Sequence, residues 1–315
     1  MFNNKKRKKR ELLSHLLHNC ADLQPKERIL LITGHKTEEL TWELEKIIKL
    51  QNNEISLHIV KCAADYLTAE DLQTARQFGK IISLVHSSVI EEQLRLLSAE
   101  KGVRILFFPA GDDAILAEEI FLYNFKNGYR LVSYFASVLT AGREIQLWSG
   151  RNARFTADIT DIKAFSCPGF ISEQFSFASP PAVTVSIFPR QSFGRLNAAE
   201  LLYGDFCASL DSQVICYVHQ GQIIDACAVK PDYEECLQII SQGYCLKEIG
   251  IGLNPYISCL ERCRLDKSMW GAIYLRFAAK NTINGQNRNS LELILTEASL
   301  VVDGTLYIFE GKIIE

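Results

Sequence analysis

The sequence predicts two folded parts, an α/β N-terminal domain with a parallel Rossmann-like sheet and a mostly antiparallel α+β C-terminal domain. Up to about residue 145, apolar strand-like runs alternate with single amphipathic helices, which is the pattern of βαβ units. After that, short strand-like runs follow one another with turn residues between them. The length of 315 residues also exceeds what one hydrophobic core usually serves. We therefore expect a basic tail and first helix over 1–20, the α/β domain over 21–145 and the α+β domain over 146–315.

Hydrophobic periodicity places the elements of the first half. A strand ending in glycine at 27–34 runs into a helix at 37–51, whose apolar residues recur at helical spacing. The alternation continues with strands at 54–62, 80–87 and 103–111 and helices at 67–79 and 89–102. Such strands belong to a parallel sheet that is covered on both faces. Neither GxGxxG nor GxxxxGK[ST] occurs, so the sequence predicts no nucleotide site.

The second half has the texture of an antiparallel sheet. HQGQ, VDGT and FEGK are typical of tight turns, because their glycines are free to adopt positive φ. One helix is expected at 233–243, ending at a glycine. The strand-like runs lie at 143–150, 153–161, 182–189, 213–225, 270–280, 290–304 and 305–314.

Charge is unevenly distributed along the chain. Residues 5–10 read KKRKKR, and removing these six positive charges from the net charge of −3 leaves −9. An acidic body argues against nucleic-acid binding, and the basic stretch is expected to be a solvated, disordered tail. No apolar run approaches the roughly 20 residues that cross a bilayer, and no apolar segment of a signal peptide follows the basic residues. We therefore expect a soluble, cytoplasmic protein that binds neither nucleic acid nor membrane.

Cysteine and histidine form no recognisable metal-binding cluster. The ten cysteines include no CxxC pair, and Cys259 and Cys263, four residues apart, are a poor metal site without a second pair. Without an export signal, mostly reduced, buried thiols are expected. His35 and His86 come at the ends of strands, where open α/β sheets bind ligands, but ordinary loop roles are commoner. His219 is interpreted as a solvated turn residue. No GxSxG motif occurs, so the pattern predicts no nucleophile.

The segment KEIGIGLNP, residues 247–255, surrounds one acidic residue, Glu248, with two glycines, an asparagine and a proline. Such a segment could hold a carboxylate over a metal, or it could simply turn the chain. A lone carboxylate in a glycine-rich turn more often caps backbone N–H groups than performs chemistry. The residues alone leave both interpretations open.

The order of motifs around this segment resembles that of the metallo-aminopeptidase family typified by aminopeptidase T and thermophilic leucyl aminopeptidase, with dihydroxypyridine dioxygenases as cousins. Members of that family carry a segment like AELGIGTNP, an EK pair, GTxHIALG, an S-x-x-H-x-D motif and a V-x-V-DGK hairpin. The similar segments here are KEIGIGLNP (247–255), DK (266–267), GAIYLRFA (271–278), SLELIL (290–295) and TLYIFEGKII (305–314). The resemblance covers most of 21–315 in outline and is specific in 245–278. It implies an aminopeptidase-like α+β domain over 146–315.

The resemblance also implies a metal site whose ligands are mostly replaced. The glutamate of AELGIG is kept as Glu248. The histidine of GTxHIALG aligns with Tyr274, the histidine and aspartate of S-x-x-H-x-D align with Leu293 and Leu295, and an earlier family glutamate aligns with Thr184. Leucine cannot bind a cation, and tyrosine is a weak ligand at neutral pH. We therefore expect a degenerate family member, a pseudoenzyme with no catalytic residue, no metal and no cofactor.

Such a protein is expected to bind rather than to catalyse. A cleft shaped for peptide termini would still bind an extended peptide by backbone pairing and side-chain pockets. The candidate ligand-binding residues of this vestigial cleft are Glu248, Asn254, Tyr274, Arg276 and Glu292. Similar proteins without metal ligands occur among accessory proteins of ribosomal peptide natural-product (RiPP) biosynthesis, including crocagin-type pathways. The resemblance thus implies a precursor peptide and its modifying enzymes as partners, and we expect a homodimer.

Two other interpretations remain open from the sequence. The chain could be a divergent metal-dependent aminopeptidase or ring-cleaving dioxygenase, with a site rebuilt from Glu248, Asp266, Glu292 and a cysteine. Alternatively, side chains fill the old cleft and only a structural role in an oligomer is left, which would appear as a packed core around Glu248.

Overall fold

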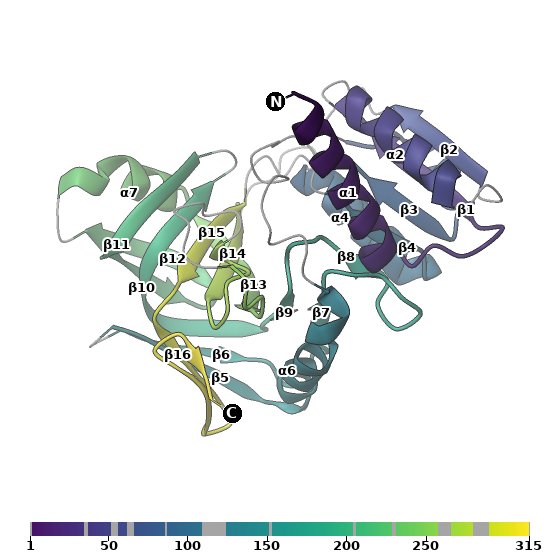
Figure 1. The fold of residues 1–315 in the computed structure, drawn as a ribbon. Coiled ribbons are helices and arrows are strands. Elements are labelled where there is room, and N and C mark those ends of the chain that lie inside the picture. The colour runs from purple at the N-terminus through teal and green to yellow at the C-terminus, as the bar shows by residue number, and fades with distance from the viewer. Residues whose placement is uncertain are drawn as a thin grey trace. The chain divides into compact units, whose positions relative to one another are not determined.

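The chain folds into two compact units in a computed structural model. Unit 1 comprises Met1–Tyr129 and Cys167–Val183, and unit 2 comprises Arg130–Ser166 and Thr184–Glu315. The residues that the structure describes are 2–34, 37–51, 56–61, 66–85, 87–108, 124–150, 153–203, 206–228, 231–257, 266–279 and 290–314. Figure 1 shows the helices and strands of both units, coloured from the N-terminus to the C-terminus.

Unit 1 is built on a parallel sheet of five strands in the order β2-β1-β3-β4-β8. The strands are β1 (Arg28–Thr33), β2 (Ser56–Lys61), β3 (Lys80–Ser83), β4 (Arg104–Phe107) and β8 (Phe177–Ala178). The helices are α1 (Phe2–Cys20), α2 (Glu38–Gln51), α3 (Ala69–Ala75), α4 (Ser88–Lys101) and the short η3 (Phe125–Gly128). Strands β1, β3 and β4 are almost wholly buried, as expected of strands covered on both faces. The predicted α/β domain with a Rossmann-like parallel sheet is confirmed.

Helix α1 departs from the sequence expectation. The basic residues 5–10, expected to form a disordered tail, lie within this helix. Lysine and arginine have high helix propensity, so a helix that is anchored further along can extend through them. The anchor is an apolar stripe of fully buried residues, Leu13, Leu16, Leu17 and Cys20. Helices α1 and α2 contact each other (Figure 1).

Local signals fix the ends of two helices of unit 1. Helix α3 begins at a capping box, in which the Thr68 side chain accepts from the N–H of Asp71 and the Asp71 carboxylate accepts from that of Thr68. Helix α4 begins after Ser87, which caps the N–H of Ile90. It ends at Gly102, whose φ of 66° lies in the left-handed region, which glycine adopts easily because it has no Cβ.

Unit 2 contains a large, mainly antiparallel sheet of thirteen strands. Its strands are β5 (Glu144–Ser149), β6 (Ala153–Asp158), β7 (Phe165–Cys167), β9 (Thr184–Ile187), β10 (Gln191–Tyr203), β11 (Phe206–His219), β12 (Gln222–Ala228), β13 (Tyr244–Gly252), β14 (Ile273–Ala279), β15 (Leu291–Leu295), β16 (Ala298–Val302), β17 (Thr305–Phe309) and β18 (Lys312–Ile313). The helices of this part are α6 (Tyr129–Ala141), η4 (Pro231–Tyr233) and α7 (Glu234–Ile240). The predicted antiparallel α+β part is confirmed.

The central strands of this sheet form a closed ring. Neighbouring strands follow the order β11-β12-β13-β14-β15-β10, and β10 also pairs with β11. Strand β9 adds to β13, and β6, β5 and β16 continue the sheet beyond β10. The ring brings residues from 200 to 295 onto adjacent strands, and this pairing assembles the site described below.

The structure also bears on two further expectations, that most cysteines are reduced and that no segment spans a membrane. Among the described cysteines, Cys20, Cys167, Cys216, Cys227, Cys236 and Cys245 are free, whereas Cys207 is disulfide-bonded. Burial raises the pKa of the Cys216 thiol to about 12, so this cysteine is an unreactive core residue. No described helix combines the length and the apolar character needed to span a bilayer.

Candidate functional site

The segment KEIGIGLNP lies mostly in a strand. Gly250 and Gly252, interpreted from the sequence as turn residues, are in β13, and the chain turns only after them, from Asn254. Glu248 is only 1 % exposed. A carboxylate buried to this degree requires charged or hydrogen-bonding partners, and its neighbours therefore decide what the segment does.

Strand register gathers the partners of Glu248 on one face. Glu248 pairs with Arg276 of β14, and Arg276 pairs with Glu292 of β15. Paired residues of antiparallel strands project from the same face, so these three side chains converge. The Tyr274 hydroxyl donates to Glu248 Oε1 over 3.0 Å, and Arg276 Nη1 lies 3.2 Å from Glu248 Oε2. Arg276 Nε donates to Glu292 Oε1 over 3.0 Å, so one guanidinium joins the two carboxylates.

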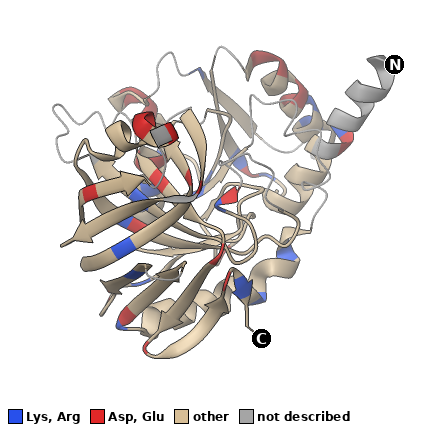
Figure 2. Ribbon diagram, turned by 90° about the vertical axis from the view of Figure 1, so that its left-hand side faces the viewer, with Lys and Arg blue, Asp and Glu red and all other residues tan. Residues whose placement is uncertain are grey.

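Lys267 completes this arrangement. Its Nζ donates to both oxygens of Glu292, over 3.0 and 3.3 Å, and lies 5.9 Å from the centre of the Tyr274 ring. We call Glu248, Lys267, Tyr274, Arg276 and Glu292 the charge network. Its two carboxylates are balanced by two cations. Most of the ribbon in Figure 2 is neither blue nor red, so Lys, Arg, Asp and Glu are spread thinly over the chain. Within the charge network the two carboxylate side chains are only 2 % and 6 % exposed, whereas Arg276 and Lys267 are 23 % and 24 % exposed.

Electrostatics keep Glu292 ionised although it is buried. Burial opposes the charge and acts to raise its pKa, but the Lys267 ammonium and then the Arg276 guanidinium outweigh burial. The pKa of Glu292 is therefore held below its usual value of 4.5. The carboxylate is charged at neutral pH and tightly engaged by the two cations.

This shift makes part of the stability depend on pH. Because the pKa of folded Glu292 is depressed, its ion pairs stabilise the protein fully above about pH 4.5, and this contribution is lost as the pH falls through the folded pKa. We expect Glu292→Gln to be destabilised at pH 7, and its gap to the wild type to narrow as the pH falls below about 4.5. Urea denaturation at pH 7, 5 and 4 measures that gap. The control Asp161→Asn changes a carboxylate whose side chain is 84 % exposed, and should show no such trend; a gap for Glu292→Gln that is constant with pH contradicts the expectation.

The two glycines of the segment allow close approach to β13. A Cβ on Gly250 would overlap the ring of Tyr274, which crosses this glycine to reach Glu248. A Cβ on Gly252 would overlap the backbone of Lys267, Ser268 and Met269. The glycines are thus explained by packing around Tyr274 and by the loop that positions Lys267.

The turn after β13 is held by Asn254. This residue is fully buried, its N–H donates to the carbonyl of Ser268 over 2.9 Å, and its Oδ1 accepts from the N–H of Tyr256. The first bond ties Ser268 of the 267–269 loop to the turn that follows β13, and the second closes that turn. The structure therefore joins four of the five expected ligand-binding residues directly, namely Glu248, Tyr274, Arg276 and Glu292, and places Asn254 in the adjoining turn.

Lys267 belongs to the network but not to the set of ligand-binding residues that the sequence predicts. The signal for it in the sequence is the DK motif at 266–267, which contains this lysine. Its neighbour Asp266 is fully buried in the same loop.

Strand register shows on which face the residues of the last motif project. Leu293 pairs with Leu275 and Leu295 with Ile273, on the face opposite Tyr274 and Arg276. Glu292 and Ile294, each one residue earlier, share the face of Glu248. A shift of the motif alignment by one residue would therefore exchange the two leucines for Glu292 and Ile294. Ile294 packs with Leu202 and Tyr274 in an apolar cluster. Thr184 of β9 pairs with Gly252, which places it on the face of Glu248.

The donor set of this face does not fit a metal ion. In the described part of the chain, no three or more His, Cys, Asp or Glu side chains come close enough to share one. Glu248 and Glu292 already contact Arg276 and Lys267, and the positions beside them carry Ile294 and Leu202. A divalent ion would have to displace two cations and would meet hydrocarbon. His35, His86, Cys259 and Cys263, considered above as possible ligands, lie outside the described residues.

Comparison with known proteins shows the fold. No protein-family model matches the chain, and no curated protein matches its sequence. Among solved structures, 2,5-dihydroxypyridine dioxygenase from Pseudomonas putida KT2440 superposes with a TM-score of 0.73 and 13 % identity, over 97 % of this chain and 96 % of that one. Wild-type AmpT from Thermus thermophilus gives a TM-score of 0.64 and 11 % identity, over 98 % and 100 %. The chain thus has an aminopeptidase-like fold, which it shares with a dioxygenase, and identities this low show the fold alone.

Proposed function

We propose that this chain, on the fold that it shares with an aminopeptidase and a dioxygenase, is a non-catalytic peptide-binding protein. The observation that carries the proposal is the charge network. Both buried carboxylates on the face of Glu248 are already neutralised by Arg276 and Lys267, over distances of 3.0 to 3.2 Å. Charges paired in this way stabilise a fixed arrangement of side chains, and they engage both Glu248 and Glu292 in place of a substrate proton or a metal ion.

The alternative is a divergent metal-dependent aminopeptidase or ring-cleaving dioxygenase with a rebuilt site. Purified full-length protein, incubated separately with Zn²⁺, Mn²⁺ and Fe²⁺ and then desalted, distinguishes the two. We expect well below one metal ion per chain by elemental analysis. Retention of one ion per chain that a chelator removes, together with its loss in Glu248→Gln, would support the alternative and overturn the proposal.

Peptide binding is tested separately from metal binding. A random peptide library displayed on phage is selected against the immobilised full-length chain, and enriched sequences are resynthesised and measured by calorimetry. We expect saturable binding by at least one enriched peptide and none by its scrambled version. A library without enrichment, or peptides that bind only nonspecifically, would refute the peptide-binding part of the proposal.

The identity of the peptide extends the same proposal. The replaced metal ligands, a feature of accessory proteins of ribosomal peptide natural-product biosynthesis, suggest a precursor peptide and its modifying enzymes as partners, bound by a cytoplasmic homodimer. Calorimetry with a precursor peptide encoded beside this gene, against a scrambled control, tests the partner. Light scattering of the purified chain tests the dimer. A monomer would contradict the proposed homodimer. Equal binding of the precursor peptide and its scrambled control would contradict the proposed partner.

A further inference from the structure

The ring of strands in unit 2 is weakly closed between β12 and β13. Strand β12 pairs with β11 along its length, from Gln222 to Ala228. On its other side, the described pairing with β13 is confined to Gln222 and Cys245. Among the described residues, the segment after Gln222 therefore has a strand partner on its β11 side only, at the point where α7 connects β12 and β13. Backbone donors and acceptors along such an edge can pair with another strand.

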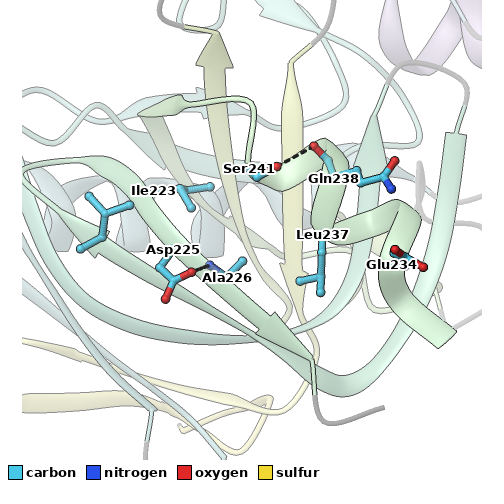
Figure 3. A pocket seen from close by; sticks show the side chains of 8 residues that line it. Ile223, Asp225, Ala226, Glu234, Leu237, Gln238 and Ser241 are labelled. Atoms are coloured by element: carbon cyan, nitrogen blue, oxygen red, sulfur yellow. Dashed lines mark hydrogen bonds between the residues drawn. The ribbon is translucent and has the colours of Figure 1, made fainter. Parts of the chain in front are cut away.

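Helix α7 and this part of β12 line an open cavity of about 290 Å³. Figure 3 shows Ile223, Asp225 and Ala226 of β12 on one side and Glu234, Leu237, Gln238 and Ser241 of α7 and its end on the other. Ile224 completes the lining. The volume lies just below the roughly 300–1,000 Å³ of small-molecule sites. It suits one long side chain better than a cofactor.

The charge of the lining favours a cation. Asp225 and Glu234 are both exposed carboxylates, and none of the eight lining residues is lysine or arginine. Ile223 and Leu237 supply apolar surface to the same cavity, which matches the hydrocarbon part of an arginine or lysine side chain. Ser241 donates to the carbonyl of Gln238, which leaves the carboxylates as the strongest polar groups of the cavity.

The backbone beside the cavity supports strand addition over a short length. The N–H of Ala226 donates to Oδ1 of Asp225 over 2.9 Å, and a peptide carbonyl could replace this surface carboxylate as the acceptor. The register between β12 and β11 shifts at Ile224. Asp225 pairs with Tyr217 and Ile223 pairs with the next residue, Val218, so Ile224 is the extra residue of a bulge. Such a bulge interrupts an edge and limits its pairing with long strands. Ile224 is 64 % exposed and forms an apolar rim to the cavity.

We infer that β12 and α7 form the docking site of an extended peptide segment, which pairs with the edge at 225–228 and inserts a lysine or arginine between Asp225 and Glu234. The inference rests on the proposed peptide-binding function and names its site and its class of ligand. Backbone pairing supplies affinity, and the cation in the acidic cavity selects the sequence.

The test uses the full-length chain and a fluorescent, acetylated peptide of alternating serine and valine with one central arginine. We expect saturable binding by fluorescence polarisation, weakened by salt because the carboxylates are exposed. The same peptide with glutamate in place of arginine, or with N-methylated backbone amides, should bind much more weakly. Asp225→Asn combined with Glu234→Gln should weaken the arginine peptide about fivefold, as two exposed charge pairs permit. Asp161→Asn, an exposed carboxylate outside this cavity, serves as the matched control.

Hydrogen exchange locates the peptide, and bound peptide should slow exchange at 225–228. If peptides from the display selection bind, but the double variant binds the arginine peptide as tightly as the wild type or the peptide slows hydrogen exchange elsewhere, the proposed site is wrong. If the display selection yields no binding peptide, the proposed function itself is wrong. A second copy of this chain at the edge would also overturn the inference. In that case the chain would form a dimer that Ile224→Lys converts to monomers, and adding the peptide would not change the dimer.

Discussion

Arg276→Met is expected to destabilise the protein by about 3 kcal/mol. Breaking a buried ion pair by removing one partner costs about 3–5 kcal/mol, because the remaining charge is left without compensation. Arg276 serves two carboxylates, whose side chains are 2 % and 6 % exposed, while its own side chain is 23 % exposed. Water reaches the arginine in part, which places the effect at the lower end of that range. Urea denaturation followed by tryptophan fluorescence measures the loss.

A second replacement separates charge balance from packing. With Arg276 removed, the network has two carboxylates and one cation, so Glu248→Gln in the same chain restores balance and leaves Glu292 with Lys267. The double variant should lose less free energy of unfolding than the two single variants together, and this coupling energy should be about 1–3 kcal/mol. Arg190→Met, at an arginine whose side chain is 52 % exposed and 3.9 Å from Asp161, is the control and should change stability by less than about 0.5 kcal/mol. Additive effects in the double variant would show that the network is not held by its charges.

The fold was largely predictable because most of its signals are local. Strands β1 and β3 and helices α2 and α4 are each a continuous run with its own periodicity, so the parallel sheet could be inferred without knowledge of contacts. Strand β8 could not be found this way. Its two residues join β4 from a distant part of the chain, and a strand of that length has no pattern of its own.

The site was predictable only in part, because it depends on pairing between strands. The sequence places Glu248, Tyr274, Arg276 and Glu292 among the candidates, but the side on which the residues of 290–295 project is set by the register of β15 against β14. The same register explains why Glu292 joins the network and Leu293 does not. Lys267 was visible as part of a motif, yet its role follows only from the approach of the 267–269 loop to β13, which Gly252 permits.

That approach leads to the second large expected effect. Gly252→Ala should destabilise the protein by about 3 kcal/mol, the upper end of the range of about 1–3 kcal/mol for inserting extra atoms into a packed site. The new methyl group would overlap main-chain atoms of Lys267, Ser268 and Met269, and main chain cannot rotate away as a side chain can. The loop must move as a whole, and Lys267 then moves away from Glu292. Thermal and urea denaturation measure the loss of stability.

Two further variants identify the cause of that loss. Gly79→Ala meets no atom within 4 Å and should change stability by no more than about 0.5 kcal/mol. Gly250→Ala overlaps the Tyr274 ring, a side chain, so replacing Tyr274 with alanine in the same protein should recover part of its loss. No such rescue by Tyr274→Ala is expected for Gly252→Ala, because the obstacle there is backbone. If Gly252→Ala is as mild as Gly79→Ala, the 267–269 loop does not pack on β13 and Lys267 is not held beside Glu292 by that contact.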